Sequence, residues 1–198
     1  MLFRSYRPTA TATATASGTP APVVVFVHGG SWRSGDKHLY RWLGKSLAGQ
    51  GCLAVLVNYG LMPEVRFPDS ARDVAAAVAF VHRHAAEWGG DPSRLTLMGH
   101  SAGAHLTALV AYDARYLAAE GLTPAILHGY VGLSGPYDFL LDTPLLRGTF
   151  AGSPEREYDA QPIHFATAAA PPSLLVMGRD DTTVNPRNTR SLAARLQI

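Results

Sequence analysis

The sequence lacks paired cysteines, long hydrophobic runs and a surplus of one charge. Its single cysteine, Cys52, precludes a disulfide within the chain. Cys52 stands at the start of an apolar run, where we expect a small buried hydrophobic side chain. No apolar run approaches the roughly 20 residues that a membrane-spanning helix needs. We therefore expect a soluble, cytoplasmic protein with no membrane partner.

The charge balance also argues against several classes of partner. Lys and Arg number 17 against 15 Asp and Glu, which gives a formal net charge of +2, and the arginines are scattered along the chain. Nucleic-acid-binding domains are typically more basic or gather their cations on one face, so we expect no nucleic-acid partner. No Cys/His cluster has metal-ligand spacing, and no glycine-rich loop has dinucleotide-binding or P-loop form. Neither a metal nor a cofactor is expected.

The length of 198 residues suits one domain with a sizeable core. Residues 1–22 are expected to form a flexible N-terminal segment, because Thr and Ala alternate from Thr9 to Ala16 and small residues and prolines follow. This acid-poor, arginine-bearing start is also compatible with a transit peptide. Residues 23–198 are then expected to form the globular domain.

Apolar runs alternate with helical patterns along this domain. Strands are predicted at residues 23–27, 53–57, 95–98, 126–133 and 174–177, and helices at residues 36–50, 69–88, from 102 onward, and 187–196. Such alternation is typical of an α/β protein with a mostly parallel sheet and helices on both faces. Right-handed crossovers would place the carboxyl ends of the strands along one edge, where open α/β sheets assemble their sites.

Two glycine-rich turns follow predicted strands and complement one another chemically. Gly99-His100-Ser101-Ala102-Gly103 lies between a strand and a helix, and its small flanking residues allow a turn tight enough to expose the hydroxyl of Ser101. His28-Gly29-Gly30-Ser31-Trp32 also follows a strand and suits the placing of backbone N–H groups near a reacting carbonyl. Ser101 is thus the candidate nucleophile. The candidate oxyanion donors are the N–H groups of Ala102 and of Gly30 or Ser31, and Trp32 is a candidate substrate-binding residue.

These two turns, in this order and strand context, make the chain resemble α/β-hydrolases of the esterase and lipase kind over most of its length. Residues 58–64, Asn-Tyr-Gly-Leu-Met-Pro-Glu, with Phe67-Pro68, resemble the "DYRLAPE…FP" signature of the hormone-sensitive-lipase branch, from which Asn58 and Gly60 depart. The turn ending in Trp32 is closer to that of kynurenine formamidases and of small feruloyl-esterase-like enzymes. The resemblance implies an α/β-hydrolase fold without a large cap.

The same resemblance selects an acid and implies a histidine. Residues 178–184 resemble the family's G-x-x-D-x-x-V segment, which assigns the acid of the triad to Asp181 rather than to its neighbour Asp180. The family order of serine, acid and histidine implies a histidine after Asp181. The last histidine is His164. Three interpretations follow: the chain is truncated at its C-terminus, it is a remnant without its base, or another histidine is recruited.

The resemblance implies a serine hydrolase that cleaves carboxylic esters of small or exposed acyl groups through an acyl-enzyme on Ser101. One alternative is an aryl formamidase acting on formylkynurenine-type amides. Another is a catalytically inactive hydrolase fold that binds a ligand or partner. If no strand follows residues 174–177, that apolar strand lies at the sheet edge and a homo-oligomer could form through it.

Overall fold

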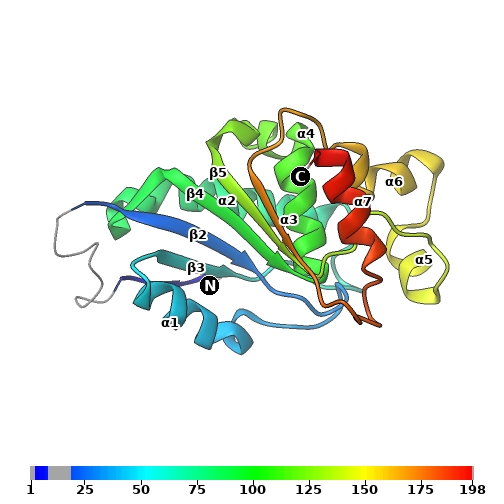
Figure 1. Ribbon diagram of the computed structural model, residues 1–198, viewed down its shortest axis with the longest axis horizontal. Helices are drawn as coiled ribbons and strands as arrows, with labels where there is room; N and C mark the ends of the chain where they lie inside the picture. The colour runs from blue at the N-terminus through cyan, green and yellow to red at the C-terminus, as the bar shows by residue number, and fades with distance from the viewer. Residues whose placement is uncertain (1–2, 9–18, 198) are drawn as a thin grey trace.

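The computed structural model describes residues 3–8 and 19–197, which form one six-stranded sheet with helices on both faces (Figure 1). The strand order across the sheet is β1-β3-β2-β4-β5-β6. The strands are β1 (Phe3–Tyr6), β2 (Ala21–Val27), β3 (Leu53–Val57), β4 (Gly90–His100), β5 (Leu127–Leu133) and β6 (Ser173–Val176). The α-helices are α1 (Arg41–Gly49), α2 (Asp69–His84), α3 (Ala102–Tyr112), α4 (Ala114–Ala118), α5 (Pro144–Phe150), α6 (Pro154–Asp159) and α7 (Arg187–Leu196).

Strands β2 to β6 are parallel, and the fold class expected from the sequence is confirmed. The helix expected at residues 36–50 divides into a short 3-10 helix, η1 (Lys37–Tyr40), followed by α1. The helix expected at residues 69–88 likewise divides into α2 and a 3-10 turn, η2 (Ala85–Trp88), which ends at Gly89. Two further 3-10 turns are η3 (Pro124–Ile126) and η4 (Pro162–His164).

The expectation of a flexible segment over residues 1–22 is wrong at both ends. Residues 3–6 form β1, which pairs antiparallel with β3, and β2 begins at Ala21. The ring of Phe3 packs against Phe80 and Trp88, with centroids 5.2 and 5.5 Å apart. A strand of four residues is too short for periodicity to reveal. Residues 9–18 of the expected segment lie outside the described residues.

The two faces of the sheet bury different side chains. Helices α2, α3 and α7 cover one face, where the main core surrounds alternate residues of β2, β3 and β4. Helix α1 covers part of the other face, where Phe26 and Leu56 meet Leu43 and Leu47. Helix α3 is buried along its whole length, so the residue that precedes it is held firmly by the core. Both turns that the sequence singles out follow central strands.

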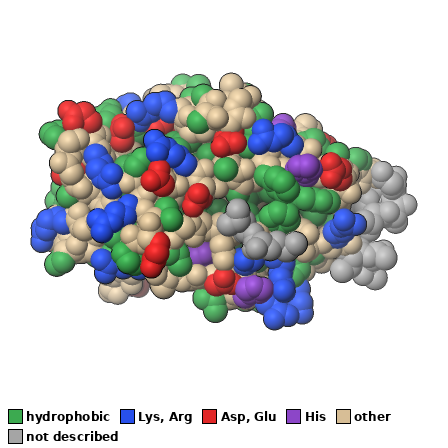
Figure 2. All heavy atoms as spheres, turned by 180° about the vertical axis from the view of Figure 1, so that it is seen from behind, with side chains coloured by type: hydrophobic (Ala, Val, Ile, Leu, Met, Phe, Trp, Pro, Cys, Tyr) green, Lys and Arg blue, Asp and Glu red, His purple; other side chains and the backbone are tan. Residues whose placement is uncertain are grey.

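Strand β6 lies at one edge of the sheet, with β5 as its neighbour. Two of its apolar side chains are exposed, Leu174 by 59% and Val176 by 45%. On the face of the molecule seen in Figure 2, basic and acidic side chains are interspersed among neutral ones. Within the described residues, no helix has the length and apolar character needed to cross a membrane.

Candidate active site

Ser101 lies between the end of β4 and the start of α3, at the tip of the expected turn. Its backbone has φ 52° and ψ −121°, a strained conformation for a residue with a side chain. The neighbouring glycines are required sterically. A Cβ on Gly99 would lie 2.5 Å from the carbonyl oxygen of Gly103, and one on Gly103 would lie 2.3 Å from that of Val27. The backbone N–H of Ser101 donates to the carbonyl of Leu133 across 2.8 Å, which ties the turn to β5.

The second turn, after β2, also has a left-handed backbone. Gly30, Ser31 and Trp32 have φ values of 130°, 53° and 59°. The carbonyl of Gly30 accepts the N–H groups of Arg33 and Ser34, at 3.1 and 2.9 Å, and so closes the turn. Within the described part of the chain, the N–H groups of residues 30–32 are not used in these turn-closing bonds. Successive N–H groups in such a turn form a concavity suited to a negatively charged oxygen.

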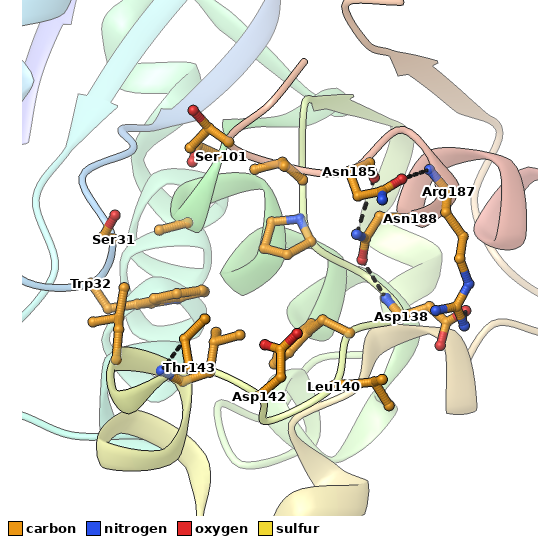
Figure 3. A pocket seen from close by; sticks show the side chains of 17 residues that line it. Ser31, Trp32, Ser101, Asp138, Leu140, Asp142, Thr143, Asn185, Arg187 and Asn188 are labelled. Carbon is orange, nitrogen blue, oxygen red and sulfur yellow. Dashed lines mark hydrogen bonds and ion pairs between the residues drawn. The ribbon is translucent and has the colours of Figure 1, made fainter. Parts of the chain in front are cut away.

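The two turns meet at a cavity of about 510 Å³ (Figure 3). Ser31, Trp32, Ser101 and Ala102 form one side of it. The other side comes from the segment after β5 with the start of α5, from the loop after β6 and from the start of α7. Its lining residues are Pro136, Asp138, Phe139, Leu140, Asp142, Thr143, Leu145, Leu146, Thr183, Val184, Asn185, Arg187 and Asn188. The structure therefore brings together four of the six residues that the sequence singled out. Gly30 belongs to the same turn but does not line the cavity.

Asp181 lies in the loop after β6, at the same edge of the sheet. Its Oδ1 accepts the backbone N–H groups of Thr183 and Val184, both at 2.9 Å. The bond from Val184 contributes most to holding the pKa of this carboxyl below its usual value, and the Ser134 hydroxyl and His100 act in the same direction. Asp181 does not itself line the cavity, although the three residues from Thr183 to Asn185 do. The neighbouring Asp180 is exposed.

Three histidines lie near the two turns, and at least one ring nitrogen of each is hydrogen-bonded. His28 is buried, and its Nδ1 donates to the carbonyl of Gly29 across 2.8 Å. His100 is bonded through Nδ1 to the hydroxyl of Tyr40 at 2.9 Å. Burial lowers the pKa of both rings, and for His100 the charge of Asp181 opposes this effect. His105 is fully buried beneath Trp32. The described lining of the cavity contains no histidine.

Sequence reasoning missed two residues that shape the site. Ser134 follows β5 with φ 47°, and its side chain contributes to lowering the pKa of Asp181. Asn188 is buried on α7, and its Oδ1 accepts the N–H groups of Tyr137 and Asp138, both at 2.8 Å. The position of Ser134 directly after a predicted strand was a usable signal. Asn188 offered none, because its bonds span about 50 residues of sequence.

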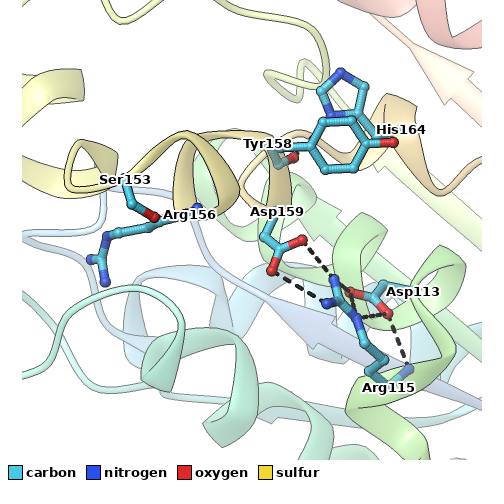
Figure 4. Close-up of polar contacts among 7 residues, drawn as sticks. All are labelled: Asp113, Arg115, Ser153, Arg156, Tyr158, Asp159 and His164. Atoms are coloured by element: carbon cyan, nitrogen blue, oxygen red, sulfur yellow. Dashed lines mark hydrogen bonds and ion pairs between the residues drawn. The ribbon is translucent and has the colours of Figure 1, made fainter.

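A second cavity, of about 420 Å³, lies between the start of α2 and helices α4 and α6. Its most prominent feature is Arg115, which forms ion pairs with Asp113 and Asp159 at 2.7 and 2.9 Å (Figure 4). Its described lining includes no serine, cysteine or histidine. This cavity therefore has no candidate nucleophile.

Comparison with known proteins agrees with the geometry. A protein-family model described as BD-FAE matches residues 12–196. A probable isoprenylcysteine alpha-carbonyl methylesterase of Arabidopsis thaliana is 31% identical, over 88% of this chain and 41% of its own length. Esterase LipC of Mycobacterium tuberculosis is 32% identical, over 88% of this chain and 48% of its own length. The chain thus spans less than half of either relative.

Solved structures give the same picture. The apo form of esterase 2 from Thermogutta terrifontis has a TM-score of 0.82 and 25% identity, over 98% of this chain and 73% of that one. The same esterase has been solved phosphonylated by sarin, with a TM-score of 0.83. The α/β-hydrolase fold implied by the sequence motifs is confirmed.

Proposed function

Because the chain belongs to the BD-FAE family, within the α/β-hydrolase fold, we propose that it is a serine hydrolase that cleaves carboxylic esters through an acyl-enzyme on Ser101. The observation that carries this proposal is the strained Ser101, which lines the cavity beside the left-handed turn of Ser31 and Trp32. A serine held in this way is set apart from the many serines that merely cap or solvate a turn.

The chemistry follows from this arrangement. The Oγ of Ser101 attacks the ester carbonyl carbon and its proton passes to a base, which leaves a negative charge on the former carbonyl oxygen. The N–H groups of Ala102 and of Gly30 or Ser31 stabilise that oxygen. When the C–O bond breaks, the alcohol leaves with a proton and the acyl group stays on Ser101. Water then attacks the acyl-enzyme and releases the acid.

The described cavity lining contains no histidine to act as the base. The role proposed for Asp181 is to hold an imidazole in one tautomer and to stabilise its cation. The two backbone N–H bonds to Asp181 keep its carboxylate charged and fixed, as this role requires. Without a base, the turnover of a triad enzyme falls on the order of a million-fold. We therefore propose that this chain alone hydrolyses esters slowly.

The cavity favours small or exposed acyl groups. The segment between β5 and β6 contains only the short helices α5, α6 and η4, and Leu140 at the cavity wall is 68% exposed. Trp32 also lines this cavity. The plant relative is named as a methylesterase, so an ester of a small alcohol is the first substrate to test.

An aryl formamide is the second candidate substrate. It is favoured by the turn that ends in Trp32, which resembles that of kynurenine formamidases and lines the cavity. Hydrolysis of formylkynurenine, measured beside that of an aryl acetate of similar size, separates the two. Faster turnover of the formamide would replace the ester in this proposal.

The deciding experiment uses the purified chain and a Ser101→Ala variant. We expect slow hydrolysis of an aryl acetate that disappears in the variant. We also expect a covalent adduct on Ser101 after treatment with a fluorophosphonate in the presence of imidazole as the base, seen by intact mass spectrometry. If the folded chain forms no adduct and shows no turnover that depends on Ser101, it is an inactive hydrolase fold that binds a ligand or partner.

A further inference from the structure

His105 links helix α3, which follows the candidate nucleophile Ser101, to the turn of residues 28–32 after β2, here called the oxyanion turn. It lies in the first turn of α3, and its backbone N–H donates to the carbonyl of Ser101 across 3.1 Å. Its side chain is fully buried, within contact distance of Trp32 and Phe150. A buried histidine costs free energy unless its polar atoms are bonded, so the partners of its two ring nitrogens are informative.

Both ring nitrogens of His105 have partners. The indole Nε1–H of Trp32 lies 3.2 Å from Nδ1, and the carbonyl oxygen of Ala160 lies 2.8 Å from Nε2. An indole N–H can only donate, so Nδ1 accepts and the ring proton sits on Nε2, from which it is donated to Ala160. Burial lowers the pKa of the ring to about 4, which keeps this neutral form at physiological pH.

Ala160, whose carbonyl accepts from His105, is itself held in place. Ala160 directly follows α6, whose last residue, Asp159, is ion-paired with Arg115 on α4. Arg115 also pairs with the buried Asp113 (Figure 4). The carbonyl of Ala160 is therefore a firm anchor for the His105 ring, and the ring in turn gives the indole of Trp32 a fixed acceptor.

Trp32, which donates to His105, lies in a turn that needs such an anchor. Ser31 and Trp32 both have positive φ without being glycine, and a backbone of this kind persists only where its surroundings hold it. The carbonyl of Trp32 accepts the N–H of Met62 across 2.8 Å, and the indole packs edge to face on Phe150 with centroids 4.9 Å apart. The bond to His105 adds a directional constraint that these contacts do not supply.

We propose that His105 is a positioning residue, which fixes the oxyanion turn relative to Ser101 through its hydrogen bond to the indole of Trp32. The inference rests on the proposed function, since the two turns need a fixed position relative to each other only if they act on the same carbonyl group. A displacement of about 1 Å between nucleophile and oxyanion donors can cost about a hundredfold in rate.

Two amide variants separate the two bonds of His105. In His105→Asn the side-chain oxygen can take the place of Nδ1 and accept from Trp32, while the bond to Ala160 is lost. In His105→Gln the amide nitrogen can take the place of Nε2 and donate to Ala160, while the acceptor for Trp32 is lost. Both variants place an amide in the same buried position. If the role of His105 were purely structural, the labelling rates of the two variants would follow their stabilities, whichever bond each variant keeps.

The measurement is the rate at which a fluorophosphonate labels Ser101 in the presence of added imidazole, followed by intact mass. Imidazole supplies the base, and labelling then requires the nucleophile and the oxyanion donors but not complete turnover. We expect His105→Gln to slow labelling about tenfold or more and His105→Asn to slow it less than threefold. The comparison requires that the two variants have equal melting temperatures. The exposed His128→Gln should label at the unaltered rate. Trp32→Phe removes the donor, and adding His105→Gln to it should slow labelling no further.

The outcomes distinguish this inference from the proposed function. If the unaltered chain is not labelled at Ser101, the proposed function fails. If it is labelled and His105→Gln reacts as fast as His105→Asn, the positioning role fails. Should His105→Gln not fold, Trp32→Phe tests the same bond from its other end: labelling at the unaltered rate would overturn the inference.

Discussion

Gly103 lies directly against the end of β2, so that a Cβ on Gly103 would be 2.3 Å from the carbonyl oxygen of Val27. The same atom would lie 2.4 Å from the carbonyl oxygen of His28. Both neighbours are backbone atoms, which cannot rotate away as a side chain would. The helix that follows Ser101 and the strand that leads to the oxyanion turn therefore touch without any intervening side chain.

The substitution Gly103→Ala should destabilise the protein, because either α3 or the end of β2 must move. We expect a loss of about 1–3 kcal/mol in the free energy of unfolding, as for other overpacked sites, and slower labelling of Ser101 by a fluorophosphonate. Chemical denaturation gives the first quantity. The matched control is Gly148→Ala in α5, where an added Cβ meets nothing within 4 Å and stability should rise by roughly 0.5–1 kcal/mol. Equal effects of the two substitutions would contradict this packing argument.

Added imidazole should accelerate ester hydrolysis by this chain. The cavity beside Ser101 has a volume of about 510 Å³, which is ample for a free imidazole near the loop of Asp181. Imidazole titrates near neutral pH and can take the proton of the serine hydroxyl. We expect turnover of an aryl acetate to rise with imidazole concentration beyond the uncatalysed reaction. The Ser101→Ala variant should show the uncatalysed acceleration alone, and an equal gain in both proteins would contradict the missing base.

The two adjacent aspartates should differ in this assay. Asp181→Asn removes the charge that is proposed to stabilise the imidazole cation, so we expect the imidazole-dependent rate to fall about tenfold or more. Asp180→Asn should leave that rate unchanged, because its side chain is exposed. The reverse pattern would assign the acid to Asp180. Melting temperatures of both variants show whether a lower rate reflects loss of the loop.

The buried ring of His105 should make stability depend on pH. Its pKa is lowered from 6.5 in the unfolded chain to about 4 in the folded protein. Between these values the unfolded chain binds a proton that the folded protein does not, so stability falls as the pH falls. The loss between pH 6.5 and 4 is on the order of 3 kcal/mol from this residue. In His105→Asn the decrease should be smaller by that order, while the exposed His128→Asn should keep it. Equal slopes in all three proteins would exclude this assignment.

The edge formed by β6 should mediate self-association. Its outer backbone groups have no neighbouring strand within the described sheet, and Leu174 and Val176 expose apolar side chains beside them. Light scattering over a range of concentrations should show a mass above that of the monomer. Leu174→Lys with Val176→Lys should restore the monomer, whereas Leu39→Lys, at an exposed apolar residue on η1, should not. A monomer at all concentrations would refute association through this edge.

Much of the fold follows from local patterns. The buried strands and the helix after Ser101 have apolar runs of the right length, and a glycine pair marks the turn. The short β1 escaped prediction because its stability comes from pairing with β3 and from the stacking of Phe3 on distant rings. Such contacts leave no periodic signal in four residues.

The site was predictable where it depends on backbone turns and unpredictable where it depends on contacts between distant segments. Ser101 and Ser31 lie in turns that the neighbouring glycines of the sequence predict. The bonds of His105 to Trp32 and of Asn188 to Tyr137 join residues 73 and 51 positions apart. Only the folded arrangement of α3 and α7 brings these partners together.

The turns that follow three neighbouring strands each contain a serine with positive φ: Ser31 in the turn after β2, Ser101 directly after β4 and Ser134 directly after β5. Glycine at each position would relieve on the order of 1 kcal/mol of strain. Stability to heat therefore favours glycine at these positions, whereas reactivity requires that position 101 remain serine. Variants of the chain selected for survival at high temperature should accumulate glycine at these three positions, whereas variants selected for turnover should retain serine at position 101.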